Sequence, residues 1–491
     1  MEVNINIPKS GRAIDEVLKE LNSFKAEDAN YKEGKTWSLV YYMGEEHNKL
    51  LKEAYSSFMH ENGLNPMAFK SLRKMEHEVI RMAAALFHGN EETVGVMTTG
   101  GTESVMLMVK TLRDRARKEK PWIRNPEIIA PESVHVALHK GCEYFDVKLK
   151  LVKLDKNYQV DMKAVKKAIN RNTIGVVGSA PQYPHGVMDP IVELSDLCYE
   201  KKIPLHVDAC LGGFLLPWFK KLGAPIPDFD FSLKGVTSIS ADLHKYGYTA
   251  KGASVLLYRS MEVMKYQFFI FEDWPGGVFA SPSMPGTKSG GSIAAAWATI
   301  QVMGEDGYLK HAKVIMETVK ELHDGINAIA GLKILGKPLM SVFAYVSTDH
   351  KLNIYAVGDL MQKRGWHIDR GQFPETIHAM VTPNHAQSVE LYLKDLRESV
   401  EMIKADPSLN NSAQAATYGM MANIPVRSMI KKQVWKMMQQ LYSSSGTTID
   451  LDKTIDKPEN MDEFMQKLGG QIVTVKKEIE RVKENFVSRF K

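Results

Sequence analysis

The segment Ser238–Gly247 (SISADLHKYG) carries a lysine, Lys245, directly after a histidine at the end of an apolar run. A lysine amine can form a Schiff base with a carbonyl compound, and pyridoxal phosphate is a cofactor that proteins hold in this way. That cofactor also needs a cradle for its phosphate and an acid for its ring nitrogen. A His-Lys pair alone is more typical of a solvent-exposed loop. Lys245 therefore becomes a candidate only together with those two features.

A glycine-rich turn could supply the cradle. The residues Thr98–Ser104 (TTGGTES) follow an apolar run and open a helical pattern that places Val105, Met108, Val109 and Leu112 on one face. Glycine lets an anion approach the backbone, and the N–H groups at a helix N-terminus bind phosphate. The same turn, with a threonine N-cap, is also typical of an ordinary helix start. The motif alone does not decide between the two.

A carboxylate could serve the ring nitrogen. The segment Pro204–Ala209 (PLHVDA) ends an apolar strand on Asp208, and α/β folds bind their ligands at the carboxyl ends of strands. Asp208 could instead be a helix N-cap, because Gly212 and Gly213 follow closely. What favours the cofactor is the chain order of a cradle, an acid and then a lysine within one predicted domain.

The elements that must position these residues alternate along the chain. The predicted strands are Glu91–Met97, Glu127–Ala130, Thr173–Ser179 and Ile203–Val207, and the predicted helices begin after Thr102, run through Leu138 and cover Ile191–Lys202. This alternation predicts an α/β fold with a mostly parallel sheet covered by helices. Two further runs, Val236–Ile239 and Ala253–Tyr258, flank a polar loop and are predicted to be paired strands of the same sheet.

The composition is that of an ordinary soluble globular protein, since 44% of the 491 residues are hydrophobic and 25% are charged. The formal net charge of +5 is too small and too dispersed to indicate nucleic-acid binding. The three cysteines, Cys142, Cys198 and Cys210, show no CxxC spacing, so neither a disulfide framework nor a metal site is expected. We recognise no membrane-spanning run and no targeting signal, and therefore expect a cytoplasmic protein.

Four parts are predicted along the chain. They are an N-terminal arm over residues 1–60, a large cofactor-binding domain over 61–307, a small C-terminal α+β domain over 308–445 and a helical tail over 446–491. The boundary near residue 307 follows from the Pro/Gly-rich stretch Trp274–Gly291 and the helix predicted after it.

The tail is predicted to end in an amphipathic helix, because apolar residues recur three and four apart from Ile472 to Phe486. Its lysines and arginines would let it make peripheral contact with an anionic membrane surface. Glu478, Glu480 and Glu484 weaken that attraction. They suit a helix that packs on the enzyme or on a second copy, which is the interpretation we favour.

Longer stretches of the chain resemble a known enzyme family. They are LRKMEHEVIRMAAALF, PQYPHGVMDP, YQFFIFEDWPGGVFASP, GEDGY and TYGM, together with TTGGTES, HVDACLGGF and VTSISADLHKYGY. Over roughly residues 34–443 the chain resembles the fold-type I pyridoxal-phosphate enzymes of the group II decarboxylase family, and within it the sphingosine-1-phosphate lyases of soluble bacterial type. The resemblance implies a mostly parallel seven-stranded sheet with helices on both faces, joined to a smaller α+β domain.

The resemblance also implies roles for individual residues. Lys245 would be attached covalently to the cofactor, Asp208 would pair with the ring nitrogen, and His135 would stack on the ring. Tyr183, in PQYPHG, would do acid/base work near the bond that is cleaved. The residues implied to hold the cofactor phosphate are Gly101, Thr102 and His244.

Further positions are implied to complete a site shared between two subunits. Tyr41 and Thr287 match positions that reach the partner subunit's site, Thr287 at the cofactor. Asn62 and Lys251 would lie near the substrate phosphate. Asn65 stands where the family has a histidine. Because an amide does not titrate near neutral pH, we expect recognition of the phosphate to differ there.

The implied activity is that of a homodimeric pyridoxal-phosphate lyase. It would cleave the Cα–Cβ bond of a phosphorylated sphingoid base to phosphoethanolamine and a fatty aldehyde. An amino-acid α-decarboxylase is the alternative, because both reactions use the same electron sink. A non-catalytic scaffold is disfavoured, since it would have no reason to keep Lys245, His244 and Asp208. Whether Tyr183, Lys245, a histidine or the substrate's own phosphate is the base stays open.

Overall fold

The computed structural model describes residues 6–411 and 427–443. The chain divides into two compact units, one of Phe24–Pro407 and the other of Met1–Ser23 with Ser408–Lys491. The described helices of the second unit are α1 (Ile14–Ser23) and α14 (Arg427–Leu441). The amphipathic helix predicted for the tail lies outside the described residues. The fold and the site below lie within Phe24–Pro407.

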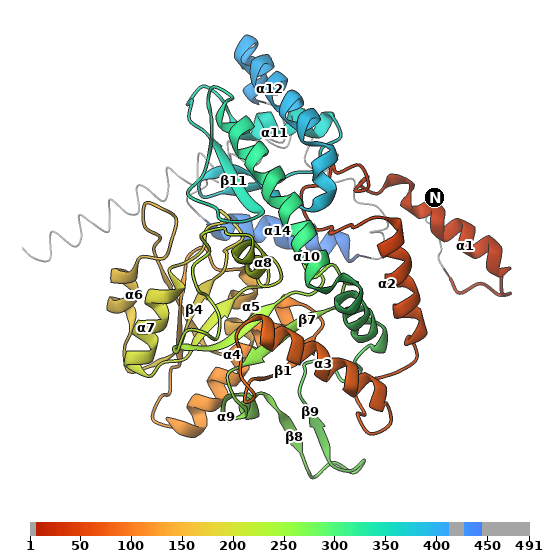
Figure 1. The fold of residues 1–491 in the computed structure, drawn as a ribbon, viewed down its shortest axis with the longest axis vertical. Helices are drawn as coiled ribbons and strands as arrows, with labels where there is room; N and C mark the ends of the chain where they lie inside the picture. The colour runs from red at the N-terminus through yellow and green to blue at the C-terminus, as the bar shows by residue number, and fades with distance from the viewer. Residues whose placement is uncertain (1–5, 412–426, 444–491) are drawn as a thin grey trace, which may run out of the picture. The chain divides into compact units, whose positions relative to one another are not determined.

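A seven-stranded sheet runs through this unit in the order β1-β7-β6-β5-β4-β2-β3 (Figure 1). Its strands are β1 (Val94–Thr98), β2 (Glu127–Pro131), β3 (Lys148–Val152), β4 (Thr173–Ser179), β5 (Leu205–Asp208), β6 (Val236–Ala241) and β7 (Ser254–Tyr258). Only β7 runs antiparallel to its neighbours, β1 and β6. The predicted mostly parallel sheet and the predicted pairing of its last two strands are confirmed.

Helices cover both faces of this sheet, as two glycines of β4 demonstrate. A Cβ built on Gly175 would lie 2.5 Å from Leu112 of α4, and one on Gly178 would lie 2.7 Å from Ile191 of α7. Residues three apart in a strand point to opposite faces, so α4 and α7 pack on opposite sides. The helices around this sheet are α3 (Lys70–Leu86), α4 (Gly101–Glu119), α5 (Val136–Tyr144), α6 (Met162–Ala168), α7 (Ile191–Lys201), α8 (Leu216–Lys221) and α9 (Met261–Met264).

Burial explains why the central strands could be recognised in the sequence. Every residue of β4 and of β5 is buried. Strands covered on both faces are continuous apolar, β-branched runs rather than alternating ones. Only one of the five residues of the edge strand β3 is buried, and its sequence, KLKLV, carries no such run.

A second, four-stranded sheet is antiparallel, in the order β10-β11-β13-β12. Its strands are β10 (Leu332–Ile334), β11 (Val342–Ser347), β12 (Asp369–Gln372) and β13 (Glu375–Met380), and its helices are α11 (Ile354–Lys363) and α12 (Val389–Ala405). The helix α10 (Gly290–Asn327) connects the two sheets and is interrupted at Gly304, whose φ is 54°. The domain boundary predicted at 307 therefore falls inside α10, just after this interruption.

The segment from Phe24 to residue 60 packs against the smaller sheet and α10. Trp37 is fully buried, and its ring centroid lies 4.2 Å from that of Tyr392. Its backbone N–H donates to the carbonyl of His367 at 2.9 Å. The helix α2 (Glu45–Ser57) follows and packs on α10. This part of the predicted N-terminal arm therefore shares the core of the larger unit.

The remaining elements are short. The hairpin β8 (Phe269–Phe271) and β9 (Phe279–Ser281) extends from the large sheet's layer (Figure 1), and the 3-10 helices are η1 (Phe24–Glu27), η2 (Lys265–Gln267), η3 (Pro383–Gln387) and η4 (Pro407–Asn411). Within residues 6–411 and 427–443, no helix combines the length and the apolar character needed to cross a membrane.

Candidate active site

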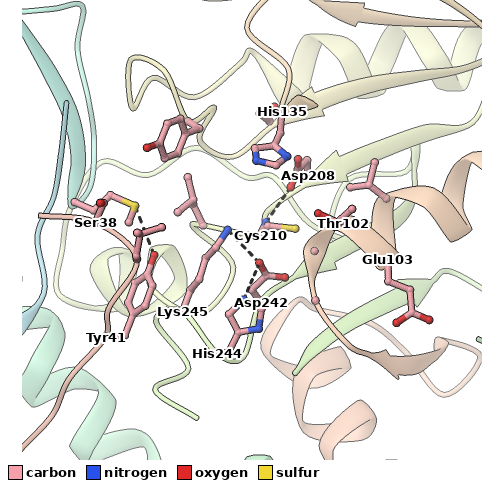
Figure 2. A pocket seen from close by; sticks show the side chains of 18 of the residues that line it. Ser38, Tyr41, Thr102, Glu103, His135, Asp208, Cys210, Asp242, His244 and Lys245 are labelled. Atoms are coloured by element: carbon pink, nitrogen blue, oxygen red, sulfur yellow. Dashed lines mark hydrogen bonds and ion pairs between the residues drawn. The ribbon is translucent and has the colours of Figure 1, made fainter. Parts of the chain in front are cut away.

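The carboxyl ends of the strands surround a cavity of ≈ 510 Å³ (Figure 2). β1 leads into Gly101, β5 ends on Asp208, β6 leads into Lys245, and His135 follows β2. All four residues line the cavity. β1 and β6 run in the same direction, because both are antiparallel to β7. The predicted cradle, acid and lysine are thus brought together at one edge of the sheet.

The N-terminus of α4 faces this cavity without a side-chain cap. A Cβ built on Gly101 would lie 2.8 Å from Cys210 Sγ and 2.9 Å from both carboxylate oxygens of Asp242, so the close approach of these side chains requires glycine there. The N–H groups and the positive dipole end of a helix N-terminus attract a phosphate. Thr102, the second residue of α4, also lines the cavity.

Asp208 is buried at the end of β5, and its Oδ1 accepts a hydrogen bond from the backbone N–H of Cys210 at 3.1 Å. His206, on the same strand, lies between the hydroxyls of Ser238 and Ser240 at 2.9 and 3.1 Å. Burial lowers the pKa of His206 to about 4. His206 is therefore neutral at pH 7 and does not compete for the negative charge of Asp208.

His135 is the N-cap of α5, and its Nδ1 accepts a hydrogen bond from the backbone N–H of Ala137 at 3.2 Å. In Figure 2 its imidazole lies beside Asp208 at the cavity. The cap fixes the position of the ring without using its other nitrogen.

Lys245 extends into the cavity, where its Nζ lies 3.0 Å from Oδ2 of Asp242 (Figure 2). His244 Nε2 lies 3.6 Å from the same oxygen. Burial alone would lower the pKa of Lys245, but the charge of Asp242 and its hydrogen bond, together with the effects of Cys210 and Asp208, outweigh burial and the pKa is raised. Lys245 is therefore an ammonium at neutral pH, paired with one carboxylate.

Tyr183 connects the cavity to the smaller sheet. Its hydroxyl donates to Asp369 Oδ2 on β12 at 2.8 Å, and its ring stacks on His378 of β13 with a centroid distance of 4.2 Å. Burial raises the pKa of Tyr183, and the charge of Asp369 adds to the effect. Burial lowers the pKa of His378. Tyr183 is therefore a protonated phenol whose hydrogen points to a carboxylate, beside a neutral imidazole.

We expect Asp369→Asn to lower kcat/KM by roughly tenfold, because a hydrogen bond to a charged group contributes about 1.5–3 kcal/mol and part of it would be retained by the amide. Loss of the carboxylate should also lower the pKa of Tyr183 and move the alkaline limb of the pH profile to lower pH. The measurement is kcat/KM against pH. In a Tyr183→Phe background the same substitution should have no further effect, and additive losses would show that Asp369 does not act through Tyr183.

Tyr41 and Lys251 line the cavity of their own chain. The Tyr41 ring packs edge-on against Tyr246 with centroids 5.0 Å apart, and Lys251 Nζ lies 5.1 Å from the Tyr41 ring centroid. Burial and the charge of Lys245 lower the pKa of Lys251. Tyr41 therefore lies at the cavity of its own chain, and its predicted reach into the partner subunit's site stays a prediction.

Three further candidates, Asn62, Asn65 and Thr287, are not among the described residues that line this cavity. Asn62 Oδ1 accepts from the Lys288 N–H at 3.0 Å, and its Nδ2 donates to the Thr287 hydroxyl at 3.4 Å. Asn65 Oδ1 accepts from the backbone N–H of Met67 at 3.0 Å. Their roles at a partner subunit's site stay predictions.

Comparison with known proteins places this geometry in a family. Residues 34–346 match the pyridoxal-dependent decarboxylase conserved domain. Sphingosine-1-phosphate lyase 1 of Rattus norvegicus is 43% identical over 445 residues, which cover 90% of this chain and 78% of that protein. A probable sphingosine-1-phosphate lyase of Legionella pneumophila is 34% identical over 80% of this chain and 66% of that protein. The chain belongs to the sphingosine-1-phosphate lyases of the pyridoxal-dependent decarboxylase family.

Solved structures agree with this assignment. The sphingosine-1-phosphate lyase of Burkholderia pseudomallei K96243 superposes with a TM-score of 0.82 at 36% identity, over 89% of this chain and 97% of that one. Glutamate decarboxylase of Lactobacillus brevis has a TM-score of 0.71 at 20% identity, over 81% of this chain and 94% of that one, which shows the shared fold alone. The predicted fold class is confirmed.

The cofactor of this lyase family is pyridoxal phosphate, and the residues present fit it. The open N-terminus of α4 and the space at Gly101 suit the phosphate. The buried Asp208 suits a ring nitrogen that carries a proton, and Lys245 is within the same cavity. We propose that these residues, with Thr102, His135 and His244, hold the cofactor.

Sequence reasoning missed several residues of the lyase cavity. They are Ser38, Leu39, Glu103, Ser179, Gln182, Cys210, Asp242 and Met380. Asp242 is the most consequential, because it is the ion-pair partner of Lys245. Its signal was present in the sequence, as an acid that follows a predicted strand three residues before the lysine.

Proposed function

We propose that this protein is a pyridoxal-phosphate-dependent aldehyde-lyase that cleaves phosphorylated sphingoid bases, such as sphingosine 1-phosphate, to phosphoethanolamine and a fatty aldehyde. The observation that carries the proposal is the cavity in which Lys245, Asp208 and the uncapped N-terminus of α4 meet. The names of the relatives, at 34% to 43% identity, support the substrate class.

Three residues of the cavity would each have a task in such a reaction. When bound, pyridoxal phosphate supplies an electron sink for the electron pair released as a bond to Cα breaks. Asp208 would keep a proton on the ring nitrogen, and His135 would hold the ring from one face. Lys245 would give up the cofactor when the substrate amine arrives and would later move protons at Cα.

The retro-aldol cleavage also needs a base for the 3-hydroxyl proton of the substrate. Tyr183 and Lys245 both line the cavity, and Tyr183 can pass its own proton to Asp369 over 2.8 Å. Lys251 provides a second lysine in the same cavity for an anionic group of the substrate.

The test is a product analysis with the purified holoenzyme. Sphingosine 1-phosphate should yield phosphoethanolamine and a long-chain aldehyde in equal amounts, and L-amino acids should yield no carbon dioxide. Release of carbon dioxide from an L-amino acid without any aldehyde would instead favour the decarboxylase alternative, which the cofactor residues alone do not exclude.

We also propose that the enzyme is a homodimer with shared active sites and that it works in the cytoplasm. Exposed apolar side chains on the β8–β9 hairpin, such as Ile270, Trp274 and Val278, support a covered surface there. The three cysteines are all unpaired, which suits a reducing compartment. Light scattering should give about twice the chain mass of 55.2 kDa, and a monomer that is fully active would contradict the shared site. Peripheral membrane contact through the tail stays a separate proposal.

A further inference from the structure

The carboxylate of Asp242 has an unusual environment. It is 3% exposed, directly after β6, and its Oδ2 contacts Lys245 Nζ at 3.0 Å and His244 Nε2 at 3.6 Å. Its Oδ1 is buried without a hydrogen-bond partner among the described residues. Burial of such an oxygen is costly, and the charges of Lys245 and His244 and the Ser254 side chain lower the pKa of Asp242 against it.

The same carboxylate lies at the place where a phosphate is expected. Both of its oxygens are 2.9 Å from a Cβ built on Gly101, at the uncapped N-terminus of α4. In Figure 2 Asp242 lies between Lys245 and the start of that helix. An anion thus already occupies the surroundings of the cradle, and a cofactor phosphate that enters must lie close to it.

The charged and titratable groups around Asp242 come from four segments. They are Lys245 and His244 after β6, Asp208 and Cys210 at the end of β5, Lys251 before β7 and Tyr41 from the N-terminal segment. Burial acts to raise the pKa of Asp242, yet the charges of Lys245 and His244 lower it. In the chain without cofactor, Asp242 is therefore a carboxylate and Lys245 is an ammonium.

We propose that Asp242 is a positioning residue that couples the arrival of the cofactor phosphate to the activation of Lys245. The inference rests on the proposed cofactor site. An ammonium cannot attack a carbonyl carbon, so Lys245 must lose a proton first. The negative phosphate, bound at the N-terminus of α4, would make the adjacent Asp242 carboxylate unfavourable and favour its protonated form. It would also attract the Lys245 ammonium, but more weakly, because Asp242 lies between Lys245 and the start of that helix. One proton then passes from Lys245 Nζ to Asp242 Oδ2 along their contact, which leaves a neutral amine and a neutral carboxyl.

The coupling has a functional consequence. Aldehydes without a phosphate would meet an ammonium and react slowly, whereas the phosphorylated cofactor would generate the reactive amine where it binds. Asp242 would thus select the cofactor by its phosphate at the chemical step as well as by affinity.

The experiment uses cofactor-free full-length protein and follows covalent attachment at Lys245 by absorbance, borohydride reduction and peptide mapping. With pyridoxal, the wild-type rate should rise about tenfold per pH unit as the amine deprotonates. With pyridoxal phosphate the rate should be nearly independent of pH between 6.5 and 8.5. Inorganic phosphate added with pyridoxal should raise the rate at pH 7 about tenfold. Equal pH dependence for the two aldehydes would overturn the proposal without any variant.

The variant Asp242→Asn removes the proton acceptor and the counter-charge. Its reaction with pyridoxal should be about tenfold faster than that of wild type at pH 7, because Asp242, the largest cause that raises the pKa of Lys245, is gone, and inorganic phosphate should no longer accelerate it. A matched control is Glu103→Gln, which removes one negative charge from the first turn of α4. Glu103 accepts hydrogen bonds from Thr99 and Met284 rather than from Lys245, so the phosphate effect should persist.

The outcomes separate this inference from the proposed function. An Asp242→Asn protein that keeps the phosphate acceleration would refute the coupling and would not contradict the proposed lyase function. Failure of the wild-type holoenzyme to form aldehyde from sphingosine 1-phosphate would refute the substrate class while leaving the attachment kinetics at Lys245 unchanged.

Discussion

Lys245→Ala should abolish covalent attachment of the cofactor and lower kcat by about 10³-fold or more. The Nζ of Lys245 lies beside Asp242, in the cavity that Asp208 and the N-terminus of α4 also line. The substitution removes both the amine that binds the aldehyde and a group that moves protons, and the proton-transfer role alone contributes about 10²- to 10⁴-fold. Pyridoxal phosphate should still bind, through α4 and Asp208, but reversibly.

The measurement is peptide mapping after borohydride reduction, together with single-turnover kinetics. The pyridoxyl group should be found on Lys245 in wild type and on no residue in Lys245→Ala. Lys251→Ala is the matched control, because Lys251 lines the same cavity and should leave the label on Lys245. A label on Lys251 in the wild-type protein would show that the anchor has been misassigned.

Much of the large sheet could be predicted because its central strands are buried on both faces. Thr173–Ser179 was predicted with the bounds that β4 has, and the helix that follows differs by one residue from α7. Lys148–Val152 was not predicted, because β3 is an edge strand whose sequence, KLKLV, alternates lysine and leucine and of which only Val152 is buried. Recognition in the sequence thus followed the degree of burial.

Some residues of the cavity could likewise be predicted from the sequence, and others could not. Asp208 and Lys245 could be proposed because each follows an apolar strand, so that the topology of a parallel sheet brings them together. The partner of Tyr183 could not, because Asp369 is brought to it by the register of the smaller sheet, where Asp369 pairs with His378. No local pattern in the sequence encodes such a contact between two sheets.

The role of Tyr41 across two subunits stays a prediction. The resemblance assigned it to a partner subunit's site, whereas the packing of residues 24–60 on the smaller sheet brings it to the cavity of its own chain. The position of Tyr41 depends on how residues 24–60, which have no core of their own, pack on the rest of the unit. Trp37 fixes that packing by inserting beside Tyr392. Complementation between a Lys245→Ala chain and a Tyr41→Phe chain would tell whether Tyr41 acts within one subunit or across two.

Asp208→Asn is expected to lower kcat by about 10²- to 10³-fold, the cost of removing one charge that is preorganised for a transition state. The buried carboxylate ends β5 in the cavity, and the neutral His206 on the same strand cannot replace its charge. An amide of the same size can still accept the hydrogen bond from Cys210 N–H, so the fold should persist. Without the carboxylate, the ring nitrogen would lose its proton near neutral pH and the electron sink would weaken.

Reconstitution separates this role from a structural one. Asp208→Asn should recover a large part of the lost activity with a cofactor that is methylated at the ring nitrogen, because the methyl group makes the positive charge permanent. The wild-type enzyme should gain nothing from the same cofactor, since Asp208 already maintains that charge. An Asp208→Asn enzyme that binds the methylated cofactor but stays inactive would show that the carboxylate acts by orienting the ring or the strand end rather than by keeping the nitrogen charged.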